Sequence, residues 1–326
     1  MAVQDISSKV MLSHNDVFSD VINGLVFERH YLDEEKLKDV IPASPYKDIK
    51  GKLRFMERDL IKEYGEGTDK NYFAIAEFGI GNQTTVDPTM PVRVMGYDYT
   101  VYKKQLDEYN NKKRELYQVL KAVRKLQNED LIKLVQLDIE RLGEFRLVPV
   151  ITIILNFSHT RWNRAKSLKE LASAKYPEIT SLMQDYRVEI FDILYLDEKV
   201  MNRFTSDFRD VAIVLSEGAI DKKHNFQRLK YPVDALDMLY AYTKDDHYLN
   251  IRNKIVKKEM NGEVINMGDF FDQVEENKII ETVKKQYSQK HNEEYAISFI
   301  ECGLNISPEE AKEIFEKEIL GAELIS

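Results

Sequence analysis

The segment Tyr72–Gln105 constrains the fold of this chain more than any other. Its first part is largely apolar, which predicts a buried strand that ends near Gln83. Asp87-Pro88 ends this strand, because proline cannot continue a central strand. Pro91 then suits the first turn of a helix. This helix carries four side chains typical of binding sites, namely Arg93, Tyr97, Tyr102 and Gln105. A core strand that ends in a polar residue and leads into such a helix is a simple way to build a site.

The charge of the chain is unevenly distributed. The 326 residues allow one large domain and an accessory one, and their net charge of −9 excludes a uniformly basic coat for nucleic acid. From Asp245 to Ser326 there are 18 acidic and 10 basic residues, which leaves 38 acidic and 37 basic before them. The N-terminal part can therefore still carry a local basic face.

The cysteine content and the N-terminus indicate a cytoplasmic protein. A single cysteine, Cys302, excludes an internal disulfide framework and fits a reducing compartment. One cysteine and six histidines give no zinc-binding pattern. The first residues lack the basic and apolar regions of a signal peptide. The longest apolar run, Leu147–Leu155, is too short to span a bilayer, so we expect no membrane segment.

An amphipathic helix is predicted near the N-terminus, with Asn15 as its N-cap. Asp20 lies inside this helix beside the apolar stripe, and the pattern alone favours a partly exposed acid. Leu32–Pro45 is expected to be loop or short helix, because Pro42 and Pro45 break its end.

A β-hairpin is predicted to precede Gln83. Lys52–Tyr64 forms its first strand, and Gly65 and Gly67 mark the turn before the Tyr72 strand. Asp59 is expected in the middle of that first strand, where acidic residues are depleted. A surface Asp facing water is the ordinary interpretation. We favour a functional role, because the next strand also ends in polar groups.

A charged helical region is predicted at about Val101–Leu142. Its lysines include Lys103, Lys104 and Lys112, and the ordinary interpretation is a solvated helix face, with phosphate contact as the functional alternative. Further strands are predicted at Leu147–Phe157 and Tyr186–Leu194. Helical segments are predicted after Ser167, which with Glu170 forms a capping-box pattern, and at Val200–Leu215. The sequence thus predicts an α/β domain over residues 1–230.

The remaining residues, 231–326, are predicted to form an acidic helical region. The expected helices are Leu236–Tyr242, Asn250–Lys258, Asn277–Gln286 and Pro308–Ile319, the last capped by Ser307. No Gly-rich phosphate loop is found, and Gly79-Ile-Gly81 lies within a strand and is no dinucleotide fingerprint.

An acid on one strand, polar residues on the next and a helix bearing Tyr and Gln together resemble the PD-(D/E)XK nucleases. Over roughly residues 10–215 the chain is similar, more specifically, to the Rpn family of recombination-promoting nucleases and putative transposases (YhgA-like). The matching segments are Phe18–Asn23, Arg58–Leu60, Gly79–Gln83, Met90–Arg93, Tyr97–Asp98, Tyr102–Gln105, Leu147–Thr152, Ser167–Leu171 and Asp185–Ile190.

The resemblance implies a restriction-endonuclease-like core that uses Mg²⁺ or Mn²⁺ to hydrolyse DNA. Asp59 matches the first metal ligand and Gln83 matches the residue that orients the water, while Asp20 corresponds to an acid on the first helix. Gly81 stands where the family has Glu, so one metal-binding carboxylate is missing. Glu77 has the same strand parity as Gly81, but four residues along a strand span about 13 Å.

The resemblance also implies a DNA-contacting surface on the helix after Pro91. Its expected DNA-binding residues are Arg93, Lys103, Lys104, Gln105 and Lys112, with Tyr97 and Tyr102 in support. A homodimer is plausible, since cleavage of two strands needs two sites.

Two functions follow from these observations. The first is a metal-dependent DNA endonuclease whose activity is impaired because Gly81 replaces Glu. The second is a catalytically silent module that binds DNA or protein. A purely structural protein is a third alternative, but it would give the ordered Asp59, Gln83, Arg93 and Gln105 no purpose.

Overall fold

The computed structural model describes residues 3–40, 43–47, 53–57, 59–68, 72–173, 175–216, 229–260, 267–304 and 306–321. Pro42 and Arg58 lie outside the described residues. The chain divides into two compact units, Met1–Glu217 and Gly218–Ser326. The boundary expected between residues 230 and 231 lies within the second of these units.

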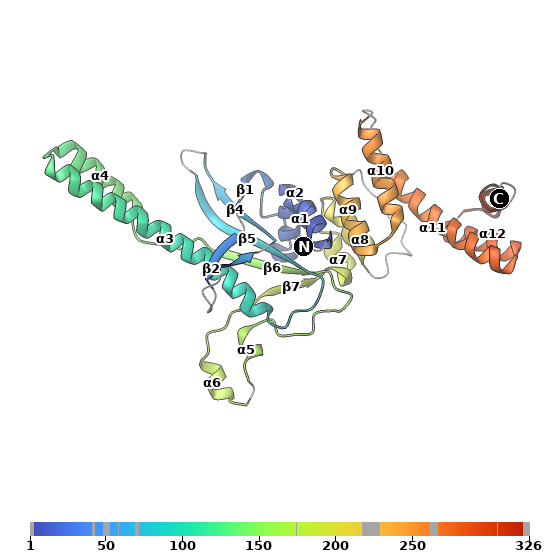
Figure 1. Ribbon diagram of the computed structural model, residues 1–326, viewed down its shortest axis with the longest axis horizontal. Coiled ribbons are helices and arrows are strands. Elements are labelled where there is room, and N and C mark those ends of the chain that lie inside the picture. Colours follow the sequence, from blue (N-terminus) through green and yellow to red (C-terminus); the bar gives the residue numbers. More distant parts are fainter. Residues whose placement is uncertain are drawn as a thin grey trace. The chain divides into compact units, whose positions relative to one another are not determined.

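The first unit is an α/β fold built on a five-stranded mixed sheet with the order β1-β4-β5-β6-β7 (Figure 1). The strands are β1 (Leu37–Asp39), β4 (Leu60–Glu66), β5 (Phe73–Gln83), β6 (Val150–Asn156) and β7 (Glu189–Asp192). The pairs β1–β4 and β4–β5 are antiparallel, whereas β5–β6 and β6–β7 are parallel. The predicted hairpin before Gln83 and the predicted α/β class are confirmed.

Two short strands form a separate antiparallel ribbon, β2 (Ala43–Lys47) with β3 (Leu53–Glu57). The expectation of loop or short helix at Leu32–Pro45 was therefore only partly right. A 3₁₀ turn, η2 (Glu34–Lys36), is followed by β1 and by the start of β2. Pairing with β4 and β3 makes these short segments into strands, and no local pattern reveals such partners.

Helices α1 (Val3–Ser13) and α2 (Asn15–Ile22) pack near the first strands. The apolar stripe of α2 is buried, as its spacing predicted. Asn15 is not the N-cap, because His14 takes that position. The Asn15 amide instead donates to the Leu37 carbonyl at 3.2 Å and accepts from Lys62 Nζ at 2.7 Å. Tertiary bonds to β1 and β4 thus replace the local cap.

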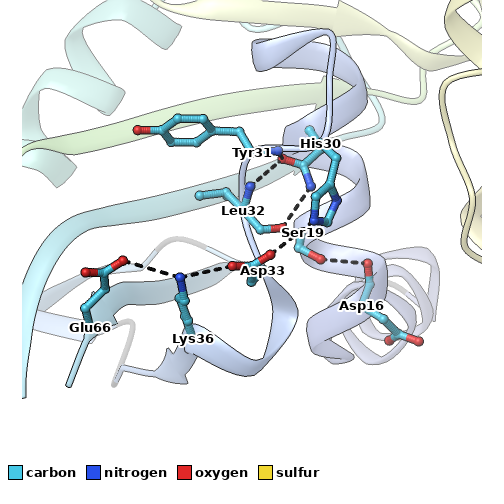
Figure 2. A network of polar contacts seen from close by, with 9 residues as sticks. Asp16, Ser19, His30, Tyr31, Leu32, Asp33, Lys36 and Glu66 are labelled. Carbon is cyan, nitrogen blue, oxygen red and sulfur yellow. Dashed lines mark hydrogen bonds and ion pairs between the residues drawn. The ribbon is translucent and has the colours of Figure 1, made fainter. Parts of the chain in front are cut away.

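The end of α2 is tied to β4 by a polar network (Figure 2). After the π-helix η1 (Asn23–Phe27), the Asn23 side chain accepts from the backbone amides of Tyr31 and Leu32 at 2.9 and 2.8 Å. Figure 2 also shows Lys36 between Asp33 and Glu66, at 3.1 and 3.3 Å from their carboxylates. These bonds fix the connection that leads into the sheet.

Helices α3 (Met90–Lys125) and α4 (Glu129–Leu142) form a hairpin (Figure 1). The first turns of α3 pack on β6 and β7 through a cluster of Met90, Val94, Tyr97, Ile154, Trp162, Val188 and Ile190. Its distal part packs on α4 through Leu120, Val123 and Val135. The single charged helical region expected at Val101–Leu142 is therefore two helices. Gln127 adopts φ 51° and the Asn128 side chain caps α4, which reverses the chain.

The segment between β6 and β7 carries α5 (Leu168–Leu171) and α6 (Pro177–Leu182). Ser167 caps α5 as predicted, although the Glu170 carboxylate accepts from the Lys166 amide and not from Ser167. The strand expected at Tyr186–Leu194 is shorter and continues into a 3₁₀ turn, η3 (Ile193–Tyr195). Helices α7 (Glu198–Met201) and α8 (Phe208–Leu215) end the unit.

The second unit is helical over its described residues. Its elements are α9 (Pro232–Thr243), α10 (Asp246–Met260), α11 (Met267–Lys290), α12 (Glu293–Leu304), α13 (Pro308–Phe315) and the π-helix η5 (Glu316–Leu320). The four predicted helices are found, and α12 was missed. The capping box of Ser307 and Glu310 is confirmed. Within the described part of the chain, no helix combines the length and apolarity needed to cross a membrane.

Candidate active site

Polar side chains gather where β5, β6 and β7 end and β4 begins. The strand register aligns Gln83 with Asn156, and Asn156 with Asp192. The Asn156 amide donates to Asp192 Oδ1 at 2.6 Å. Leu60 pairs with Ile80, so the residue before β4 lies at the same edge of the sheet. In sheets with parallel strands, ligands commonly bind at this carboxyl edge.

Asp59 lies immediately before β4, not in the middle of a strand as expected, because β3 and β4 are separate strands. Its Oδ2 accepts a hydrogen bond from the backbone amide of Asn82, which joins it to the end of β5. Its Oδ1 is 3.0 Å from Lys9 Nζ, and the Asp59 side chain is 16% exposed. Burial raises the pKa of the Asp59 carboxyl, and the Asn82 amide and Lys9 ammonium offset only part of that effect.

Lys9 is a site residue that the sequence analysis missed. It lies on α1, with its ammonium also 3.5 Å from Asp5 one turn earlier. Burial alone would lower the pKa of Lys9, but its hydrogen bond to Asp59 and the negative charges nearby raise it overall. Asp5 and Lys9 have the i, i+4 spacing of a helical ion pair, so the sequence could have predicted helix α1, although not the contact of Lys9 with Asp59.

The position of Gly81 faces Asp59. A Cβ atom added to Gly81 would lie 4.0 Å from Asp59 Oδ2 and 2.9 Å from Ile154 Cδ1. A longer side chain at position 81 would therefore begin beside the Asp59 carboxylate. The structure thus brings together Asp59 and the position at which the family resemblance implies a second acid.

The side-chain amides of Asn82 and Gln83, which follow Gly81, differ in their hydrogen bonding. Gln83 Nε2 donates to the carbonyl of Asn82 at 2.7 Å, so this side chain folds back on its own strand. Asn82 is 8% exposed, and among the described residues no group lies within hydrogen-bonding reach of its Oδ1 or Nδ2. The sequence pattern predicts no role for Asn82.

The Asp20 carboxylate is engaged in internal hydrogen bonds of the first unit. It is 8% exposed, which corrects the partly exposed acid that the pattern favoured. Its two carboxylate oxygens accept from the backbone amides and hydroxyls of Thr205 and Ser206, at distances from 2.6 to 3.0 Å. Asp20 therefore ties α2 to the segment before α8. These bonds occupy both carboxylate oxygens of the acid that the family resemblance implies on the first helix.

Arg93 is held on α3 by two neighbours. Its Nη1 donates to Asp87 Oδ2 at 2.7 Å, while Nε and Nη2 donate to the Tyr97 hydroxyl at 3.2 and 2.9 Å. The Arg93 side chain remains 41% exposed. Tyr97 and Asp87 thus position the Arg93 guanidinium near the start of α3.

Gln105 and Tyr102 bind the entry to β6. The Gln105 amide donates to Glu77 Oε1 at 3.1 Å and to the Val148 carbonyl at 3.2 Å, and accepts from the Val148 amide at 3.0 Å. The Tyr102 hydroxyl accepts from the Val150 amide at 3.1 Å. These contacts give both side chains a role in aligning α3 with the sheet.

The lysines of α3 lie on its solvent-exposed surface. Lys103 forms an ion pair with Asp107 one turn along the helix, and Lys104 Nζ lies 3.8 Å from Glu108. Both lysines are about half exposed, and Lys112 is exposed as well. Exposed pairs of this spacing contribute only about 0.3–0.5 kcal/mol, so a phosphate can displace them.

The donor set at Asp59 does not fit the Mg²⁺ or Mn²⁺ ion that the family resemblance implies. Magnesium prefers near-octahedral oxygen ligands, and here one carboxylate is paired with an ammonium 3.0 Å away. Gly81 adds no side-chain oxygen. Over the described residues, no three His, Cys, Asp or Glu side chains lie close enough together to hold a metal ion.

Comparison of the chain with protein-family models, curated proteins and solved structures gives no match.

Proposed function

We propose that the first unit is a PD-(D/E)XK-type nuclease fold of the Rpn kind whose own DNA cleavage is impaired. The antiparallel β4–β5 hairpin, the α3 connection and the parallel strands β6 and β7 support this proposal. The observation that carries it is the geometry of Gly81, whose Cβ direction leads to within 4.0 Å of Asp59 Oδ2. A Glu at this position would provide the second carboxylate of a metal-assisted hydrolytic site.

Plasmid nicking in the presence of Mg²⁺ or Mn²⁺ tests this function. We expect little or no metal-dependent cleavage by the parent chain. Gly81→Glu is expected to raise the nicking rate at least about 100-fold, since even supporting groups around a metal change activity 10–100-fold. Adding Asp59→Ala to Gly81→Glu is expected to abolish the gain. A fully active parent chain that Gly81→Glu leaves unchanged would contradict the proposal.

A second candidate is a silent DNA-binding module, which the Lys9–Asp59 ion pair favours. An ammonium 3.0 Å from the remaining carboxylate balances its charge without a metal ion. In that case the exposed lysines of α3 would hold the phosphate backbone, while no bond is broken. The two candidates differ in the Gly81→Glu variant, because the silent module is expected to bind DNA and remain inactive even with the acid restored.

A further inference from the structure

The outer face of α4 carries exposed leucines, while α3 is the element on which α4 mainly packs. The inner face, with Ile132, Val135 and Ile139, packs on α3. On the other side, Leu131, Leu134 and Leu137 are 42%, 57% and 48% exposed. In Figure 1 the α3–α4 hairpin extends away from the five-stranded sheet. A helix with two apolar faces usually packs on both.

Charged residues flank the two central leucines of this outer face in a fixed order. Asp130, Leu134, Leu137 and Arg141 follow the spacing i, i+4, i+7 and i+11, which places them on one side of the helix. The face therefore reads acid, leucine, leucine, base from its N-terminal to its C-terminal end. We define these four residues as the α4 stripe.

The α4 stripe is complementary to itself when reversed. If a second α4 lies antiparallel, with Leu134 opposite Leu137 of the second copy, Asp130 lies opposite Arg141 of that copy. A parallel pairing would instead place like charges together, which is unfavourable. A two-fold axis forms every one of these contacts twice, as a symmetric dimer requires.

We propose that the α4 stripe is a homodimer interface in which two copies of the chain pair antiparallel through α4. Each Arg141 now lies 3.5 Å from Asp138 of its own helix, and its side chain is 78% exposed, so it can reach across the axis. A 14-residue helix is about 21 Å long, and one such pair buries less than the roughly 1,200 Å² of standard interfaces. The dimer is therefore expected to dissociate on dilution.

Sedimentation velocity of the full chain over a wide concentration range tests the interface. We expect a reversible monomer–dimer equilibrium, and we expect Leu134→Glu to leave only monomer. Asp130→Arg and Arg141→Asp, made singly, each oppose like charges at two symmetric places. Each is expected to weaken dimerisation about tenfold, because both the attraction and its replacement by repulsion count twice.

The double variant Asp130→Arg/Arg141→Asp restores opposite charges across the axis and is expected to recover the parental dimer. Glu129→Arg is the matched control, because it makes the same change one residue away, in the same first helical turn but off the stripe. It is expected to leave dimerisation unchanged, and far-UV circular dichroism checks that every variant keeps its helices. A monomer at all concentrations, or a double variant that stays as weak as the singles, would overturn the proposal.

Discussion

The glutamate of Gly81→Glu must fit into the folded core before it can bind a metal ion. The structure predicts how much this lowers the free energy of unfolding. A Cβ at position 81 would approach Ile154 Cδ1 to 2.9 Å, which is closer than an ordinary van der Waals contact. Overpacking a core typically costs about 1–3 kcal/mol. We expect the lower half of this range, because Cδ1 is the flexible end of its side chain. Replacing a glycine within a strand returns about 0.5–1 kcal/mol.

From steric overlap and backbone entropy, the net destabilisation of Gly81→Glu is therefore expected to be about 0–1.5 kcal/mol, to which repulsion from the Asp59 carboxylate adds. Ile154→Val removes the Cδ1 atom that the new side chain meets. Alone it is expected to cost about 0.5–1.5 kcal/mol, as usual for loss of one buried methyl group. In the presence of Gly81→Glu it is expected to cost nothing or to stabilise, which is a favourable coupling of about 1 kcal/mol.

Urea denaturation of the four proteins in this double-mutant cycle measures the coupling. Ile153→Val is the matched control, because Ile153 is fully buried on the same strand but points to the opposite face of the sheet. It is expected to cost as much as Ile154→Val and to show no coupling to Gly81→Glu. Equal effects of Ile154→Val with and without the glutamate would refute the placement of position 81 against Ile154.

Two further predictions concern DNA binding and pH. Reversing the charges of Lys103 and Lys104 is expected to weaken binding to all DNA sequences alike and to reduce the slope of log affinity against log salt by about 2. Fluorescence anisotropy measures this slope, and salt-independent affinity would exclude phosphate contact. Burial raises the pKa of the Asp210 carboxyl to about 6. The protonated form therefore contributes to the free energy of unfolding in full below about pH 4, and this contribution is lost as the pH rises through about 6. Urea denaturation at several pH values measures this loss, which is expected to be about 1–2 kcal/mol and to be absent in Asp210→Asn. The same pH dependence of stability in Asp210→Asn and the parent chain would contradict the assignment to Asp210.

The elements around Gly81 were predictable because their signals are local. The apolar run before Gln83 gives β5, and Pro91 lies in the first turn of α3. Gly65 near the end of β4 and Gly67 after it indicate a hairpin, and a hairpin places the start of one strand beside the end of the other. The hairpin thus brings Asp59 and Gly81 to the same end of the strand pair, while the register shift between Tyr64 and Gly65, which sets the exact pairing, has no local signal.

The other expected site residues depend on contacts that no local pattern reveals. Asp20 is bound by Thr205 and Ser206, which lie 185 and 186 residues later in the chain. Gln105 bonds with Val148 across 43 residues. A polar helix residue that hydrogen-bonds to a distant part of the backbone looks the same in the sequence as one that binds a ligand. Only the fold separates the two, and here it assigns both side chains to internal bonds.

The charge at Asp59 links the absence of a carboxylate at Gly81 to the presence of Lys9. The mostly buried Asp59 carboxylate needs a compensating positive charge, and the Lys9 ammonium supplies it while also lying 3.5 Å from the partly exposed Asp5. Two carboxylates at this place would exceed what one lysine balances, and the pKa of one of them would rise strongly unless a divalent ion bound. With glycine at position 81, Lys9 is the cation that pairs with Asp59, and no metal ion is needed for that pairing. The Lys9–Asp59 ion pair and the glycine are therefore electrostatically consistent, because a second carboxylate at position 81 would need a further cation that the present arrangement does not.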